Sequence, residues 1–171
     1  MADIACLQIA AAPETPAGTL RRVIDAVMPA LQARDVAVVI EGHASLAKSL
    51  GADGVHLGDA AAYAEARKTL GPDAIVGIAS PVERHAAMEI AETGADYLLF
   101  DIGAAETVPE VLAWWAEMMT VPLVARGRFS PAACSAFVAA GIDFLAPDAG
   151  LWAAGDPIAD LAALAAAIRA R

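Results

Sequence analysis

Short apolar stretches recur along the chain, and longer alanine-rich segments with helical spacing separate them. Most of the stretches lack polar alternation, which is typical of strands that are covered on both faces in a parallel sheet. The predicted strands are Ile4–Ala10, Val36–Ile40, Gly54–Gly58, Ala74–Ala79, Tyr97–Ile102, Pro122–Ala125 and Phe144–Ala146. Seven strands that alternate with seven helices predict an α/β fold of seven βα units.

A four-residue near-repeat divides this pattern into longer periods. Its copies are Gly51–Gly54, Gly94–Tyr97 and Gly141–Phe144, each between a predicted helix and the next strand. Their spacing of 43 and 47 residues corresponds to two βα units per period. We therefore expect a (β/α) barrel of the TIM type, formed as one domain over residues 1–171, with a doubly wound open sheet as the alternative.

Composition and net charge indicate which kinds of molecule the protein is not expected to bind. The chain has 171 residues, 58% of them hydrophobic, and a formal net charge of −10. A negative field repels phosphate backbones and anionic lipid surfaces, so neither nucleic acid nor a membrane is an expected partner. The N-terminal residues lack a secretory signal pattern, which predicts a cytoplasmic protein. The two cysteines show no metal-ligand spacing.

The segment Gly51–Gly58 resembles the thiamine phosphate synthase and TenI family of small (β/α) barrels. The resemblance continues through Leu70–Asp73, Ile75–Ile78, Gly94–Tyr97, Pro122–Ala125 and Ser130–Pro131. The 33-residue interval between Gln8 and Glu41 also matches the family's spacing. In this register Ile4–Ala10 falls on the family's second strand, so the resemblance implies that the family's first βα unit is missing from this sequence. Unpaired edges of such a barrel attract other chains, and we expect a homodimer.

The family joins an aminopyrimidine diphosphate to a thiazole phosphate and expels pyrophosphate. The resemblance implies that cations and a carboxylate-held Mg²⁺ stabilise the leaving group. Gln8 is kept, but the family's neighbouring cations and its Mg²⁺ carboxylates are replaced at Ala10, Ala12, Gly42 and Ala61. We therefore expect no metal and no cofactor, with Mg²⁺ needed only if the chain is an active synthase.

Several polar residues remain at the predicted carboxyl ends of strands, where barrel enzymes place their sites. The expected ligand- or phosphate-binding residues are Gln8, Arg126, Gly127, Arg128 and Gly150. The weaker catalytic candidates are Glu41, His43 and Asp59. The two arginines flank the position where the family binds phosphate, and a guanidinium fork suits that anion. The alternative is that these charges pair with one another, with Arg126 neutralising Asp101 or Asp148.

Trp114 and Trp115 lie in the predicted helix after the Tyr97–Ile102 strand. Neighbouring residues on a helix point about 100° apart, so the two rings cannot both face inward. One of them is therefore expected at an interface between chains.

Three functions follow from these observations. The first hypothesis is a divergent, non-synthase family member that binds a small thiamin-related or phosphorylated ligand. The second is an active thiamine phosphate synthase with a rebuilt site, and the third is a scaffold or regulatory partner without catalysis.

Overall fold

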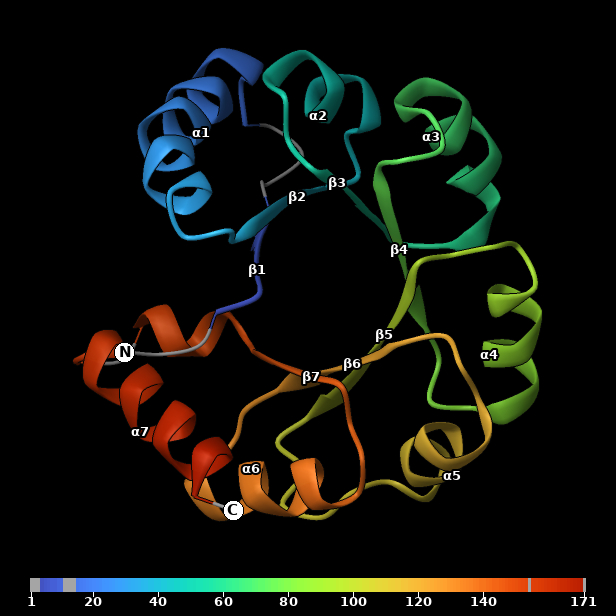
Figure 1. Ribbon diagram of the computed structural model, residues 1–171, viewed down its shortest axis with the longest axis vertical. Coiled ribbons are helices and arrows are strands. Elements are labelled where there is room, and N and C mark those ends of the chain that lie inside the picture. Colours follow the sequence, from blue (N-terminus) through green and yellow to red (C-terminus); the bar gives the residue numbers. More distant parts are fainter. Residues whose placement is uncertain (1–3, 11–14, 154, 171) are drawn as a thin grey trace. The chain divides into compact units, whose positions relative to one another are not determined.

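The computed structural model describes residues 4–10, 15–153 and 155–170. Its contacts divide the chain into two compact units, Ile4–Ile78 and Ala79–Arg171. In each unit Figure 1 shows parallel strands with the helices on one side of them. The strands follow the sequence order within each unit, which is the arrangement that the repeated βα pattern predicts.

The first unit begins with strand β1 and ends within strand β4. Its elements are β1 (Cys6–Ile9), α1 (Ala17–Gln32), β2 (Ala37–Glu41), α2 (Ala44–Leu50), β3 (Gly54–Leu57), η1 (Ala60–Ala62), α3 (Tyr63–Leu70) and β4 (Ile75–Ser80). β1 pairs with β2, β2 with β3 and β3 with β4, all parallel. The carboxyl ends of these strands therefore lie at one edge of the sheet.

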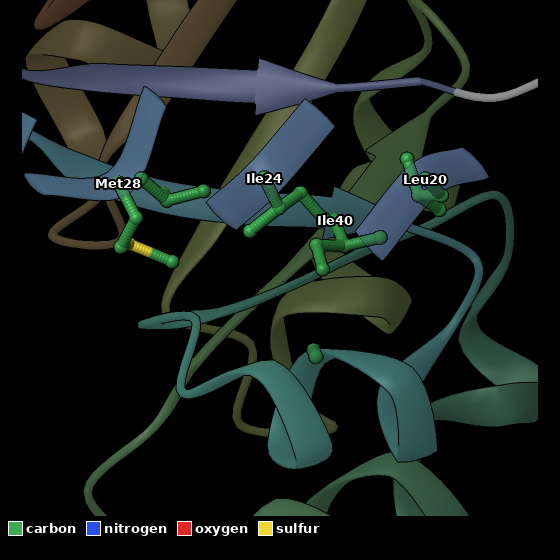
Figure 2. Packing of buried hydrophobic residues seen from close by; sticks show 6 residues of the cluster. Leu20, Ile24, Met28 and Ile40 are labelled. Carbon is green, nitrogen blue, oxygen red and sulfur yellow. The ribbon is translucent and has the colours of Figure 1, made fainter. Parts of the chain in front are cut away.

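The core of the first unit forms where α1 packs on β2. Leu20, Ile24 and Met28 recur at four-residue spacing, so one face of α1 is apolar, and all three are buried. Figure 2 shows Ile24 next to Ile40 of β2, with Met28 and Leu20 of the same cluster on either side. This packing holds β2 in place and thereby positions the turn that follows Glu41.

The second unit carries three strands. Its elements are α4 (Arg84–Ala91), β5 (Tyr97–Gly103), α5 (Glu110–Met118), β6 (Leu123–Gly127), α6 (Pro131–Ala139), β7 (Phe144–Pro147), η2 (Ala149–Ala153) and α7 (Pro157–Arg169). β6 pairs in parallel with β5 and β7, and the β5 register shifts between Asp101 and Gly103. Phe100 and Trp115 are fully buried, with ring centroids 5.8 Å apart. β6 thus lies between two strands that both bring polar residues to its carboxyl end.

The near-repeat of the sequence ties neighbouring strands together where they begin. Asp53 precedes β3, and its Oδ2 accepts a hydrogen bond of 2.7 Å from the backbone N–H of Val38 in β2. Asp143 precedes β7 and accepts one of 2.9 Å from Leu123 at the start of β6. Both donors belong to buried residues, so the carboxylates satisfy N–H groups that would otherwise be costly to leave unpaired.

All seven predicted strands are present, with ends that differ by up to two residues. The predicted start of α6 is also confirmed, because Ser130 Oγ accepts the N–H of Ala133 and Pro131 opens the helix. The expectation of burial on both faces is wrong for β1 and β7, whose residues are exposed or half-buried. None of the described helices is long and apolar enough to cross a membrane.

Candidate functional site

Arg126 lies near the end of β6, directly beside Asp101 in the register of β5. Its Nε and Nη2 donate hydrogen bonds of 3.1 and 2.9 Å to Asp101 Oδ2. The guanidinium therefore already has a carboxylate partner. Of the two interpretations left open by the sequence, the structure favours neutralisation of Asp101 for this arginine.

Gly127 brings three strand ends into close contact. A Cβ at this position would lie 2.3 Å from the carbonyl oxygen of Gly103, so only glycine fits. The same carbonyl accepts the N–H of Arg128 at 2.8 Å, while Gly127 in turn accepts the N–H of Asp148 at 2.9 Å. These bonds fix the backbone from which the Arg128 side chain leaves.

Arg128 presents the most exposed guanidinium of this cluster. Its side chain is 73% exposed, and its Nη2 lies 3.9 Å from Asp148 Oδ2, at the outer limit of an ion pair. Asp148 Oδ1 accepts the N–H of Gly150 at 2.8 Å. A Cβ on Gly150 would come within 2.8 Å of that oxygen and 3.2 Å of Arg128 Nη2. Glycine at position 150 therefore leaves room for the two charged groups to face each other.

A pocket of about 320 Å³ opens beside these groups within the second unit. Its lining includes Gly127, Arg128 and Gly150, three of the residues that the sequence predicted to bind phosphate. The remaining lining residues are Phe129, Pro131, Pro147, Asp148, Leu151, Asp160, Ala163 and Leu164. The lining thus combines apolar side chains with one guanidinium and two carboxylates, Asp148 and Asp160. The apolar walls suit a small ligand, and Arg128 is the cationic side chain of this lining that faces an anion.

Sequence reasoning missed Asp160 and Leu164. Both lie on α7 and enter the pocket because α7 packs beside η2 and α6. No motif in the sequence marks them. Their spacing of four residues places both on one face of a helix, and this is the sequence feature that links them.

The candidates of the first unit divide into a pair and two separate residues. Gln8 Nε2 donates a hydrogen bond of 3.2 Å to Glu41 Oε2, and both side chains are half-buried at the ends of β1 and β2. His43 is exposed at the residue before α2. Asp59 Oδ1 accepts the N–H of Ala61 and so caps η1. The structure thus brings Gln8 and Glu41 together and shows a local structural role for Asp59.

A second cavity, of about 360 Å³, lies in the first unit. Gly42 and His43 line it, together with residues of α1, α2 and α3. Gly42 has a φ of +71°, a left-handed conformation that L residues rarely adopt. Over residues 4–10, 15–153 and 155–170, no three His, Cys, Asp or Glu side chains gather as a metal ion would require.

The parallel βα units and the pocket at their carboxyl ends define the class of the fold. The solved structure of a thiamine phosphate pyrophosphorylase from Pyrococcus furiosus matches 96% of this chain and 82% of its own, with a TM-score of 0.81 and 20% identity. This likeness shows a (β/α) fold of the TIM type.

The sequence comparisons identify the family within that class. The family model for thiamine monophosphate synthase matches residues 2–147. The thiamine-phosphate synthase of Rhodospirillum centenum is 41% identical over 159 residues, covering 88% of this chain and 76% of the relative. That of Erythrobacter litoralis is 42% identical over 149 residues, covering 81% and 70%. The chain belongs to the thiamine monophosphate synthase family, as the resemblance of Gly51–Gly58 predicted.

Proposed function

We propose that the chain is a thiamine-phosphate synthase with a rebuilt site, which joins an aminopyrimidine diphosphate to a thiazole phosphate and releases pyrophosphate. The observation that carries this proposal is the 41% identity to a thiamine-phosphate synthase over 88% of the chain. Nothing in the comparisons favours a non-catalytic member, so the second of the three hypotheses replaces the first as the main one.

The pocket beside Arg128 supports binding of the thiazole phosphate. The guanidinium supplies a forked donor for a phosphate group, and the backbone bonds through Gly127 hold its strand end in place. The apolar walls formed by Phe129 and Leu151 suit the ring of such a ligand. Arg126 instead neutralises the charge of Asp101 through their ion pair.

In the first unit, Gln8 stands at the position where the family grips the diphosphate. Its amide nitrogen donates one N–H to Glu41, which leaves the second N–H of the same group to donate to a diphosphate oxygen. The family's Mg²⁺ would stabilise the departing pyrophosphate. Mg²⁺ is commonly held by one or two carboxylates together with substrate phosphates, and Glu41 beside Gln8 is a carboxylate that would contribute.

The proposal is tested by incubating the purified chain with both substrates and measuring thiamine phosphate by chromatography. Parallel reactions with Mg²⁺ and with a chelator show whether the metal is required.

Arg128→Ala should raise the KM for thiazole phosphate about 10-fold or more, because a hydrogen bond to a charged group contributes about 1.5–3 kcal/mol. Arg22→Ala, which removes the same charge from the exposed surface of α1, should leave KM unchanged. Absence of product in every reaction contradicts the proposal.

Binding without catalysis is the second candidate function. It is favoured by Ala10, Ala12, Gly42 and Ala61, which stand where the family carries cations and carboxylates. Thermal unfolding with thiamine phosphate distinguishes the two candidates. Ligand at 100 times its dissociation constant adds about 2.7 kcal/mol to the unfolding free energy. A clear shift without product formation would support a binding protein.

A further inference from the structure

The carboxylate of Asp148 faces two groups that are expected to bind an anion, the N–H of Gly150 and the guanidinium of Arg128. Its Oδ1 accepts the N–H of Gly150 at 2.8 Å, and its Oδ2 lies 3.9 Å from Arg128 Nη2. The Asp148 side chain is 30% exposed and is fixed by the first of these bonds, whereas Arg128 is 73% exposed and held only loosely. The donors expected to hold phosphate are therefore directed at an acceptor of the chain itself.

We propose that Asp148 is an internal competitor for phosphate that lowers and tunes the anion affinity of the Arg128 pocket. The inference rests on the proposed function and extends it to the regulation of the same site. A phosphate that binds Arg128 must come close to the Asp148 carboxylate or make it turn away. Either event costs free energy, because like charges repel and the bond to Gly150 is lost.

The geometry around Gly150 allows Asp148, and not the other carboxylate of the pocket, to compete with phosphate for Arg128. Glycine at this position lets Asp148 and Arg128 approach on the same side of the turn, where a Cβ would contact both. Asp160 also lines the pocket, but among the described residues its side chain makes no hydrogen bond or ion pair to either donor. The two carboxylates carry the same charge into one pocket, and only Asp148 contacts the donors.

This difference provides a matched pair of variants. Asp148→Asn keeps an oxygen for the N–H of Gly150 and removes the charge that faces Arg128. Asp160→Asn removes the same charge from the same pocket, but it leaves the contacts of the Gly150 N–H and the Arg128 guanidinium with Asp148 unchanged. The affinity of each purified protein for inorganic phosphate is measured by calorimetry, with ionic strength held constant by chloride.

Asp148→Asn is expected to tighten phosphate binding about two- to fivefold, the range that an exposed ion pair covers. Asp160→Asn should give less than half of that gain, and the double variant Asp148→Asn/Arg128→Ala should lose it. Equal gains in the two single variants, or no phosphate binding by Asp148→Asn, would overturn the inference. A gain in phosphate affinity without synthase activity in any protein would reject the proposed function and leave this inference standing.

Discussion

Gly127 determines whether the strand ends around Arg128 can meet. Replacing it with alanine would place a Cβ 2.3 Å from the Gly103 carbonyl, so the β5 and β6 ends must separate. We expect Gly127→Ala to lower the unfolding free energy by about 1–3 kcal/mol, measured by urea denaturation. Gly58→Ala is the control, because nothing lies within 4 Å of an added Cβ there. Equal stability of the two variants would show that the strand ends do not need this contact.

The positions of the charged residues, and one of their pairings, were predictable from the sequence. It placed Arg126 and Arg128 at a strand end and offered Asp101 or Asp148 as the partner of Arg126, but it left open whether the arginines pair or bind an anion. The answer depends on the parallel register that sets Asp101 beside Arg126, and register arises from packing of whole elements. The loose contact of Arg128 with Asp148 likewise depends on the backbone of the Gly150 turn, which no local pattern describes.

The two adjacent tryptophans of helix α5 point in different directions, because neighbouring residues on a helix are about 100° apart. Trp115 is fully buried and donates its Nε1–H to the carbonyl of Val121 at 2.9 Å, whereas Trp114 is half-buried with the Arg84 guanidinium 5.0 Å from its ring centroid. Trp115→Ala should cost about 3–5 kcal/mol of unfolding free energy. Trp114→Ala should cost less, about 1–2 kcal/mol, because it removes a half-buried ring with its cation–π contact to Arg84 and its edge contact to Trp115. Similar losses in denaturant titrations of the two variants would contradict this assignment.

Helix α4 begins with a carboxylate cap that makes its stability depend on pH. The backbone N–H groups of Ala86 and His85 donate to Glu83 and hold the pKa of that carboxyl below its usual value. Because the folded pKa is the lower one, the stabilisation is complete above the unfolded pKa and disappears as pH falls through the folded pKa.

The replacement Glu83→Gln therefore should lower the unfolding midpoint near neutral pH and leave it unchanged in acid. Glu117→Gln on α5 serves as the control, since no hydrogen bond of its side chain to a described residue is present. Thermal unfolding followed by circular dichroism across the acid range measures the difference. A gap between wild type and Glu83→Gln that persists in acid would exclude this cap as its cause.

At the level of elements, the sequence predicted strands and helices well because both signals are local. Apolar runs give strands, and residues such as Ser130 mark helix starts within four residues. The burial of each strand was harder to predict, because β1 and β7 have the apolar composition of central strands but are partly exposed. How much of a strand is covered depends on its neighbours, which composition does not reveal.

For the whole molecule, association into a homodimer stays a prediction. β7 pairs with β6 on one side and exposes 46% of Phe144. Light scattering after gel filtration should give twice the mass of one chain, and Phe144→Glu should shift the population toward single chains. Val23→Glu is the matched control, because Val23 is 47% exposed but lies on α1. The mass of one chain at every concentration would reject the dimer.

The carboxylates of Asp53 and Asp143 secure the strands where they begin, whereas Arg128 and Gly150 lie where strands end. In parallel βα folds the two ends can therefore change independently, one serving stability and the other chemistry. The same separation makes the protein a suitable parent for loop libraries, in which new ligand specificities are selected while the unfolding midpoint of the parent is retained.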